Sequence, residues 1–284
     1  MTTILKGSDV AAGMEAGLRL EGELLRQKGI EPKLGIIRVG KRPGDLAYER
    51  GTLKRFEKLG IAAQVFEFSD LIDQQSFLAE FGKINSSADV HGILMFRPLP
   101  LHLDEKAITK LIDSRKDVDG MNPLNAAKVF SGEGDGFAPC TPGAVMEMLD
   151  YASVDLSGKN VAIVGRSMVV GRPLAMLMLG RNATVTICHT KTRDMEEICR
   201  AADVVIAAAG RARILTPSYV SAKSIVIDVG INTDEEGKLC GDVDYEAVAP
   251  LVSMISPVPG GVGSVTTSIL ATHVLKAASL CAPP

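Results

Sequence analysis

Short runs rich in Val and Ile alternate with helical patterns along almost the whole of this 284-residue chain. In the first half the strand-like runs are KLGIIRV, AAQVFEF and HGILMF, and helical patterns cover about 8–28, 43–59 and 74–85. In the second half the strand-like runs are NVAIVG, TVTIC, DVVIAAA, SIVIDVG and VSMIS. Parallel strands need crossover connections, which are usually helices. The alternation therefore predicts an α/β fold with mainly parallel sheets, whose strands are buried on both faces.

A stretch without hydrophobic periodicity separates the two halves. Its sequence, SRKDVDGMNPLNAAKVFSGEGDGFAPCTPG, accumulates Gly, Pro, Asp and Asn, which favour turns and loops. We expect a hinge near Pro139 and two domains, because 284 residues are enough for two medium-sized hydrophobic cores. The closing segment SVTTSILATHVLKAASL has the apolar spacing of a helix.

The composition indicates a globular protein that binds a small molecule. The formal net charge is −3, so the chain lacks the excess of Lys and Arg that nucleic-acid and membrane surfaces use. No apolar run reaches the roughly 18 residues of a membrane span, and the N-terminus lacks a secretory pattern. Five cysteines without C-x-x-C spacing predict neither a disulfide framework nor a metal site, and they fit a reducing cytoplasm.

The stretch VGRSMVVGRP, residues 164–173, links a predicted strand to a predicted helix. Gly165 allows a tight turn, Gly171 allows close approach of the backbone, and Pro173 suits the first helical turn. Backbone N–H groups at such a helix start bind phosphate, so the stretch predicts a dinucleotide-binding turn. The spacing differs from G-x-G-x-x-G, and a turn that merely needs glycine is the alternative. Ser167 is not expected to be a nucleophile, because a nucleophile elbow needs glycine two residues later.

The residues after the next predicted strand favour NADP over NAD. About 20 residues beyond the turn, NAD-binding proteins usually carry an Asp or Glu for the ribose hydroxyls. Here the run TVTIC is followed by His189, Thr190, Lys191, Thr192 and Arg193. Together with Arg166, these donors suit the 2′-phosphate of NADP, which a carboxylate would oppose. The alternative is that Lys191 and Arg193 only face solvent.

Four further stretches have compositions that packing alone does not require. They are HGILMFRPLPLH (91–102), KDVDG (116–120), PCTPG (139–143) and PVPGGVGSVT (257–266). The first and the last follow predicted strands, where the ligand sites of α/β sheets gather. Three glycines within PGGVG indicate a ligand that approaches the backbone, and a tight loop is the alternative.

These stretches, together with LSGKNVAIVGRSMVVGRPLA, ATVTICHTKT and IVIDVGIN, resemble in their order the methylenetetrahydrofolate dehydrogenase/cyclohydrolase family along almost the whole chain. The resemblance implies an N-terminal α/β folate-binding catalytic domain at 1–138 and a Rossmann-type NADP-binding domain at 139–265. It also implies a C-terminal helix within 266–284 that returns to the first domain. A homodimer that serves one-carbon metabolism and purine biosynthesis is implied as well.

The same resemblance implies an activity and a set of site residues. Hydride passes from 5,10-methylenetetrahydrofolate to NADP, which gives 5,10-methenyltetrahydrofolate, and family members commonly hydrolyse that product to 10-formyltetrahydrofolate. The substrate residues implied are Tyr48, Asp119, Pro259, Gly260 and Gly261, of which Tyr48 and Asp119 are also catalytic. The cofactor residues implied are Gly165, Arg166, Ser167, Gly171, His189, Thr190, Lys191 and Ile231.

The chain departs from the family pattern at two catalytic positions. The family has a lysine four residues after the tyrosine, where this chain has Thr52, and a glutamine where this chain has Phe96. Lys54 is rotated by about 200° from position 52 around a helix, so it should point away. Arg55 is rotated by about 60° and could approach the site, but its guanidinium stays protonated. We therefore expect the dehydrogenase activity to persist and the cyclohydrolase activity to be weak or lost.

Three other functions stay open at this point. One is a fully bifunctional dehydrogenase/cyclohydrolase. The second is another two-domain NAD(P) dehydrogenase for a hydroxy or amino acid, although no Lys–Asp or His-centred proton relay stands at a fitting place in the first half. The third is an NADP-binding sensor without catalysis, which the missing lysine and glutamine make worth testing.

Smaller departures from the family are Arg97 and Ser264.

Overall fold

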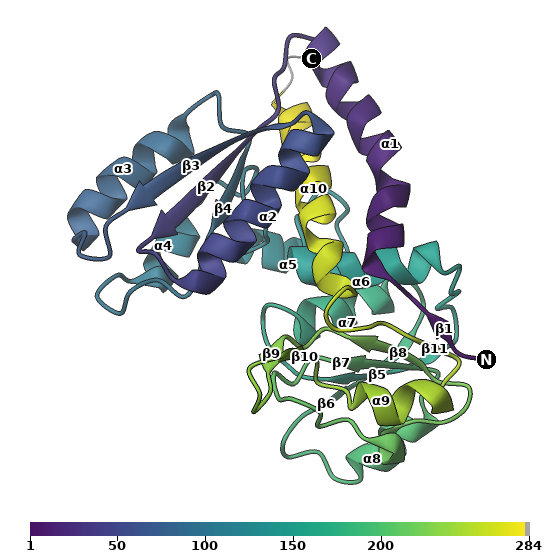
Figure 1. Cartoon of the computed structure of the whole chain (residues 1–284). Helices are drawn as coiled ribbons and strands as arrows, with labels where there is room; N and C mark the ends of the chain where they lie inside the picture. The colour runs from purple at the N-terminus through teal and green to yellow at the C-terminus, as the bar shows by residue number, and fades with distance from the viewer. Residues whose placement is uncertain (282–284) are drawn as a thin grey trace. The chain divides into compact units, whose positions relative to one another are not determined.

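The computed structural model describes residues 1–281 and divides into two compact units. One contains a three-stranded sheet and is formed by Met14–Cys140 and the segment that begins at Thr267. The other contains a six-stranded sheet and is formed by Met1–Gly13 and Thr141–Thr266. We call them the three-stranded unit and the six-stranded unit. Both of these sheets consist of parallel strands with helices packed around them, which confirms the predicted fold class (Figure 1).

The three-stranded unit matches the elements predicted for the first half. Its strands are β2 (Lys33–Val39), β3 (Ala62–Phe68) and β4 (Gly92–Met95), in the order β3-β2-β4. Its helices are α2 (Pro43–Leu59), α3 (Gln74–Ser86), α4 (Glu105–Leu111), α5 (Pro123–Ser131), α10 (Thr266–Leu280) and most of α1 (Gly7–Gln27). β2 pairs in parallel with β3 along its whole length and with β4 over four residues. No helix within residues 1–281 is long and apolar enough to cross a membrane.

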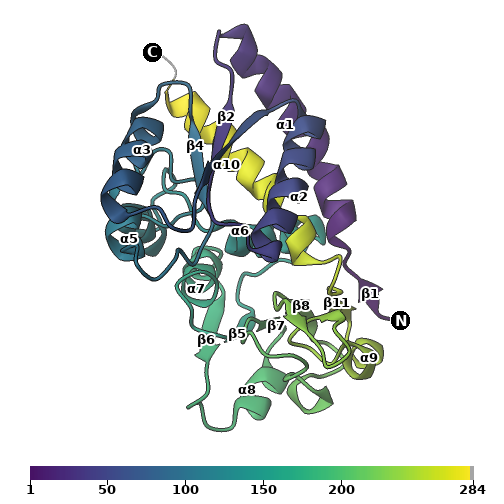
Figure 2. The ribbon, with the colours of Figure 1, turned by 60° about the vertical axis from the view of Figure 1, so that its left-hand side comes forward.

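Helices cover both faces of the three-stranded sheet. On one face Phe77 of α3 packs in a core with Ile37 of β2. On the other face, to which β2 turns alternate side chains such as the fully buried Ile36, lie α2 and α10 (Figures 1 and 2). α10 approaches β4 closely, since a Cβ at Gly92 would lie 2.9 Å from a methyl group of Val274. The C-terminal helix therefore returns to the unit built from the first half, as expected.

The six-stranded unit has the strand order β1-β11-β8-β7-β5-β6, and every neighbouring pair is parallel. Its strands are β1 (Thr3–Ile4), β5 (Asn160–Val164), β6 (Thr184–Cys188), β7 (Val204–Ala207), β8 (Ile225–Asp228) and β11 (Met254–Ile255). Its helices are α6 (Cys140–Tyr151), α7 (Gly171–Leu179), α8 (Met195–Ala201) and α9 (Tyr245–Val248). Short 3-10 helices are η1 (Pro217–Tyr219), η2 (Ala249–Leu251) and η3 (Val262–Ser264). A separate antiparallel hairpin joins β9 (Asn232–Thr233) and β10 (Leu239–Cys240).

The central strands of this sheet are buried on both faces, as their Val- and Ile-rich runs predicted. In β5, Ile163 faces one side and Val164 faces the other, and both are at most 2% exposed. α6 and α7 cover one face, and α8 and α9 cover the other (Figure 1). For β6 the prediction was wrong, because Thr184 and Thr186 are exposed. β6 lies at the edge of the sheet, so helices cover it less completely.

Residues 1–13, which we expect in the first domain from the sequence, belong by their contacts to the six-stranded unit. Their link is β1, in which Thr3 and Ile4 pair with β11 at the edge of the sheet. A strand of two residues is too short to carry a hydrophobic period, so no local pattern reveals this pairing.

Replacing Phe77 by alanine should lower the free energy of unfolding of the three-stranded unit by about 3–5 kcal/mol, because Phe77 is fully buried in its core. Phe130→Ala is the matched control, since Phe130 lies on α5 of the same unit and is 76% exposed. This control should change the free energy by less than about 0.5 kcal/mol. Urea unfolding followed by circular dichroism measures both variants. Equal losses in the two would contradict this packing.

Candidate functional site

The chain reverses its direction of travel across the six-stranded sheet at β5. From β5 it passes through α7 to β6 at one side, and α8 then carries it back to β7 at the other side of β5. In parallel sheets such a reversal leaves a crevice outside the carboxyl ends of the flanking strands, and ligands bind there. The turns after β5, β6 and β7 are therefore the parts of this unit that its topology offers to a ligand.

Two glycines let the turn after β5 fold tightly against its neighbours. Gly165 has a φ of +142°, and a Cβ there would lie 2.1 Å from Ala208 O in the turn after β7. A Cβ at Gly171 would lie 2.0 Å from Gly165 O. No side chain fits at either position. The structure thus brings the two predicted glycines together, and the exposed residues 166–169 between them lie at the start of α7, where backbone N–H groups bind anions.

Ser167 shapes this turn from within. Its hydroxyl oxygen accepts a hydrogen bond from Val170 N at 3.0 Å, and its carbonyl accepts one from Arg172 N at 3.1 Å. The Arg172 side chain donates through Nε to Arg166 O at 3.2 Å. Because the Ser167 hydroxyl acts here as an acceptor, it keeps its proton for donation to a ligand.

The turn after β6 lies beside the turn after β5, since Gly165 N donates to Cys188 O at 2.9 Å. Within it, Lys191 N donates to His189 Nδ1 at 3.1 Å, so the neutral imidazole carries its proton on Nε2. Thr190, the residue between them, is exposed. The exposed cations of the two turns are Arg166, Lys191 and Arg193. Across the part of the chain that the structure describes, no acidic group forms an ion pair with any of these cations.

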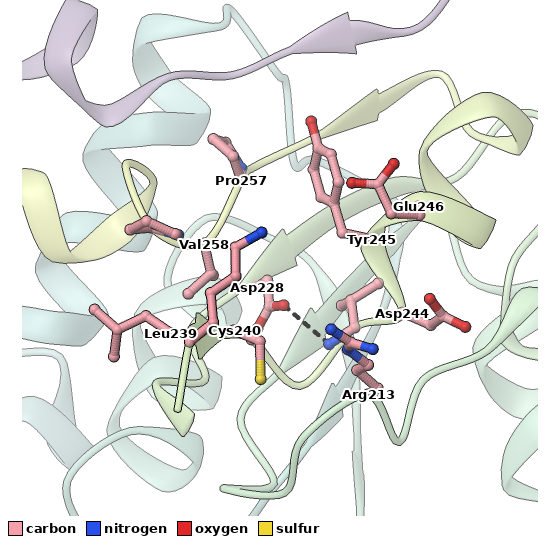
Figure 3. A pocket seen from close by; sticks show the side chains of 13 residues that line it. Arg213, Asp228, Leu239, Cys240, Asp244, Tyr245, Glu246, Pro257 and Val258 are labelled. Atoms are coloured by element: carbon pink, nitrogen blue, oxygen red, sulfur yellow. Dashed lines mark hydrogen bonds between the residues drawn. The ribbon is translucent and has the colours of Figure 1, made fainter. Parts of the chain in front are cut away.

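The glycine-rich loop after β11 packs against the start of α1. Gly7 N donates to Gly260 O at 2.8 Å, and a Cβ at Gly7 would lie 2.0 Å from Gly261 O. Pro259 and Gly260 are exposed, whereas Gly261 is buried. A cavity of about 330 Å³ lies beside this loop, and its walls include Pro259 and residues 238–241 (Figure 3). Its volume is at the lower end of the range of small-molecule sites.

Asp228, at the end of β8, forms part of the wall of this cavity and is 3% exposed (Figure 3). Its carboxylate accepts hydrogen bonds from Gly230 N, Asp242 N and Val243 N at 2.9–3.0 Å. Burial raises the pKa of Asp228 to about 6. Ile231, which the family resemblance assigns to the cofactor, follows in the same turn and is 70% exposed.

Sequence reasoning missed Asp228, Asp242 and the turn after β7. Asp242 is fully buried and accepts three backbone hydrogen bonds from that turn. A local signal exists only in the Asp and Gly residues of IVIDVGIN and LCGDVD, which are polar and small where strands end. That signal does not reveal which segments the carboxylates join.

In the three-stranded unit, Tyr48, Thr52 and Phe96 form one cluster. The rings of Tyr48 and Phe96 meet edge to face with centroids 5.8 Å apart. Thr52 is fully buried, and its hydroxyl donates to Tyr48 O at 2.9 Å. Phe96 is 6% exposed, whereas Tyr48 is 36% exposed. The neighbours of Tyr48 at positions 52 and 96 are therefore a hydrogen-bonded hydroxyl and an apolar ring. Neither group exchanges protons readily near neutral pH.

The other cations near this cluster are engaged or turned away. Lys54 is exposed, as its rotation around α2 predicted. The Arg55 guanidinium donates to Glu15 Oε2 at 3.2 Å and to Ser268 Oγ at 3.1 Å. Arg97 Nη1 lies 3.9 Å from Glu105 Oε1.

A buried carboxylate holds the KDVDG segment in place. Asp117 is fully buried, and burial raises its pKa. Its donors are Met121 N, Asn122 N and Asn125 Nδ2, at 2.7–2.9 Å. Asp119, which follows, is only half-buried and accepts a bond from Cys140 N at 3.1 Å. The Asp119 carboxylate therefore retains lone pairs that can accept N–H groups of a ligand.

Cys140 and His273 lie behind Asp119 as neutral packing groups. Burial raises the pKa of the Cys140 thiol well above its usual range, and Sγ donates to Val118 O at 3.4 Å. Burial lowers the pKa of His273, whose Nδ1 donates to the same oxygen at 2.8 Å. Neither side chain brings a charge to the site.

Gly171→Ala should destabilise the six-stranded unit by about 1–3 kcal/mol, because the backbone of the turn must shift to relieve the contact with Gly165 O. Gly180→Ala is the control at the other end of α7, where the nearest atom to a Cβ is Leu177 O at an ordinary 3.4 Å. Its effect should stay below about 0.5 kcal/mol. Thermal unfolding of both variants measures the difference. A Gly171→Ala variant as stable as the control would disprove the close approach.

Two family models together match most of the chain. Residues 139–282 match a model described as tetrahydrofolate dehydrogenase/cyclohydrolase, NAD(P)-binding domain. Residues 5–119 match the model of the tetrahydrofolate dehydrogenase/cyclohydrolase catalytic domain.

Relatives with names and solved structures are similar over nearly their whole length. The bifunctional protein FolD of Clostridioides difficile (strain 630) is 53% identical over 277 residues, which are 98% of this chain and 96% of the relative. The bifunctional enzyme FolD-methylenetetrahydrofolate dehydrogenase/cyclohydrolase from Campylobacter jejuni is 41% identical, with a TM-score of 0.95 and 99% of each chain covered. The N5,N10-methylenetetrahydrofolate dehydrogenase-cyclohydrolase of Trypanosoma brucei, complexed with NADP cofactor and inhibitor, is 33% identical, with a TM-score of 0.92 and 98% of each chain covered.

Proposed function

Because the chain belongs to the tetrahydrofolate dehydrogenase/cyclohydrolase family, we propose that it oxidises 5,10-methylenetetrahydrofolate to 5,10-methenyltetrahydrofolate with NADP and hydrolyses this product weakly or not at all. The observation that carries the proposal is the buried Thr52, whose hydroxyl is bonded to Tyr48 O beside the ring of Phe96. The oxidation is supported separately by the glycine-lined turn and the cations of the six-stranded unit.

NADP binds outside the carboxyl ends of β5 and β6 in this proposal. The turn from Gly165 to Gly171 receives the pyrophosphate, with the hydroxyl of Ser167 as an additional donor. The 2′-phosphate lies between the turns after β5 and β6 in this proposal. Its donors are Arg166 of the first turn and Thr190, Lys191 and His189 Nε2 of the second. Charge-assisted hydrogen bonds to a phosphate are stronger than bonds between neutral groups, and no carboxylate pairs with these cations within residues 1–281. When bound, NADP supplies the hydride acceptor of the reaction.

The family resemblance assigns Tyr48, Asp119, Pro259, Gly260 and Gly261 to the folate. In the three-stranded unit, Tyr48 offers a partly exposed aromatic ring, and Asp119 offers carboxylate lone pairs to N–H groups of the pterin. The glycine-rich loop at Pro259, Gly260 and Gly261 lies in the six-stranded unit, where Pro259 and Gly260 are exposed. The methylene C–H bond breaks and its electron pair leaves with the hydride, so the reaction requires alignment of two carbon atoms and no proton transfer.

Hydrolysis of the methenyl product makes a different demand. Water must attack the methenyl carbon and lose a proton, which general acid–base catalysis speeds by about 10²- to 10⁴-fold. The Thr52 hydroxyl is bonded within α2, and Phe96 has no hydrogen-bonding group. The Arg55 guanidinium is bonded to Glu15, and guanidinium groups do not transfer protons readily near neutral pH. Hydrolysis in this proposal therefore lacks the proton-transferring group that the family uses at position 52.

We further propose a cytoplasmic homodimer that takes part in one-carbon metabolism and purine biosynthesis. The dimer and the pathway rest on the family resemblance. The compartment is supported by four cysteines that are buried and unpaired, Cys140, Cys188, Cys199 and Cys240.

The purified protein should reduce NADP on addition of 5,10-methylenetetrahydrofolate, and it should prefer NADP to NAD. Lys191→Ala should raise the KM for NADP about tenfold and leave the KM for NAD unchanged, because a charge-assisted bond to the 2′-phosphate is lost. The matched control is Lys223→Ala, which removes the same charge. Lys223 precedes β8 and therefore lies at the amino ends of the strands, away from the proposed NADP site. Absorbance at the nicotinamide band measures all three proteins. Equal effects of the two substitutions would contradict the proposed 2′-phosphate site.

Hydrolysis of 5,10-methenyltetrahydrofolate by the wild type should run at less than about one-hundredth of the rate of hydride transfer. Thr52→Lys restores the family's residue and should raise hydrolysis at least about tenfold without a matching rise in hydride transfer. Thr52→Ser, which keeps the hydroxyl, is the control for the substitution itself, and circular dichroism verifies the fold of each variant. Rapid hydrolysis by the wild type would instead establish a fully bifunctional enzyme.

The same assays separate the other two functions. An NADP-binding sensor would bind NADP without reducing it when the folate is added. A dehydrogenase for a hydroxy or amino acid would reduce NADP only with those substrates.

A further inference from the structure

Two buried carboxylates, those of Asp228 and Asp242, accept hydrogen bonds from three segments at the carboxyl ends of the strands in the six-stranded sheet. These segments are residues 209–211, 230–232 and 242–243. We propose that Asp242 is a positioning residue for NADP binding, and that Asp228 holds Asp242 in place. The inference rests on the proposed function only in taking NADP as the ligand. It adds a role for residues that touch neither phosphate nor nicotinamide themselves.

Asp242 is completely buried, and its charge is balanced by N–H groups alone. Its donors are Ala209 N at 2.5 Å, Gly210 N at 2.9 Å, Arg211 N at 2.9 Å and Asn232 Nδ2 at 2.8 Å. No Lys or Arg within residues 1–281 forms an ion pair with Asp242. A buried carboxylate is costly unless its oxygens are fully bonded, so the four donors must keep these positions.

One side of this arrangement supports the phosphate turn. The three backbone donors form the turn after β7, and that turn begins at Ala208, whose carbonyl oxygen would lie 2.1 Å from a Cβ at Gly165. The surface against which the Gly165 turn rests is therefore set by Asp242. A shift of the turn after β7 changes the place of the pyrophosphate.

The other side holds Ile231. Gly230 N donates to Asp228 at 2.9 Å, and the Asn232 side chain donates to Asp242 at 2.8 Å. Both chain neighbours of Ile231 are therefore held by hydrogen bonds to the two carboxylates. An isoleucine that is 70% exposed contributes little to the core. With the 2′-phosphate at β6 and the pyrophosphate at β5, the nicotinamide half of the dinucleotide extends over β7 and β8, where Ile231 lies.

Asp228 and two glycines, Gly230 and Gly241, keep Asp242 in its position. Asp242 N and Val243 N donate hydrogen bonds to the Asp228 carboxylate at 3.0 and 2.9 Å. A Cβ at Gly230 would lie 2.2 Å from Asp242 Oδ1, and a Cβ at Gly241 would collide with Asp228 Oδ2. Both glycines make room for carboxylates, because side chains at these positions would expel them.

Asp117 provides a comparison within the same chain. It is also fully buried and also accepts only N–H donors, but it lies in the three-stranded unit. A purely structural role for Asp242 predicts that Asp117→Asn and Asp242→Asn affect the protein alike. A positioning role predicts that NADP affinity responds to the second substitution alone.

The experiment is titration calorimetry of NADP with the folded full-length protein, without folate. Asp242→Asn should raise the Kd for NADP about 10- to 100-fold, because an amide N–H group then faces backbone N–H groups in the turn. Asp117→Asn should lower the unfolding temperature comparably and leave the Kd for NADP within about twofold. Equal Kd values for Asp242→Asn and wild type, or equal weakening by both substitutions, would overturn the inference.

Asn232→Ala is the second variant and decides the matter if Asp242→Asn does not fold. It removes a single donor and leaves the backbone bonds intact, so the Kd for NADP should rise about 3- to 10-fold. The Kd for adenosine 2′,5′-bisphosphate, which lacks the nicotinamide half, should not change. Unchanged NADP affinity, or equal loss with both ligands, would contradict the role assigned to Asn232 and Ile231. If the wild type binds neither NADP nor NAD, the proposed function fails, and the inference fails with it.

Discussion

Every strand of the three-stranded and six-stranded sheets pairs in parallel with its neighbours, and the candidate site follows from that geometry. Parallel strands cannot be joined by tight hairpins, so helices cross the sheet between them and bury both faces. The carboxyl ends then lie along one edge, where each strand ends in a turn. In the six-stranded unit the turns after β5, β6, β7 and β8 become neighbours for this reason, although they are far apart in the sequence. The strand order reverses at β5, and parallel sheets bind ligands at such a reversal.

The strands and the turns of the six-stranded unit are specified by different forces. Val and Ile side chains bury the strands on both faces, and many similar sequences would satisfy that demand. The turns are specified by contacts that leave no room for variation. At Gly165 and Gly171 backbone atoms leave no room for a Cβ. At Gly230 and Gly241 the carboxylates of Asp242 and Asp228 occupy the place that a Cβ would take. Asp228 and Asp242 then bind backbone N–H groups in an interior of low dielectric constant, where such bonds are strong.

In the three-stranded unit, Thr52 and Phe96 hold Tyr48 in position but supply no group for proton transfer. Phe96 holds the Tyr48 ring by an edge contact, and Thr52 holds the Tyr48 backbone by a hydrogen bond. Both interactions define the orientation of an aromatic surface, and orientation is what hydride transfer requires. Neither group titrates near neutral pH, so the arrangement provides order without proton exchange. Under the proposed function, this pairing favours oxidation of the folate over hydrolysis of the product.

Local pattern in the sequence was sufficient for the fold class, for most strands and for the glycine turn. β2 and β3 have the bounds of their apolar runs, and Gly165 and Gly171 lie where a strand meets a helix, because burial and backbone sterics act between residues close in the chain. Position 52 was recognised as threonine, but only the tertiary structure decided that its hydroxyl is buried and bonded. β1 and Asp242 escaped sequence reasoning altogether. Their partners lie about 250 and 31–33 residues away, and no hydrophobic period or turn signal encodes pairing over such distances.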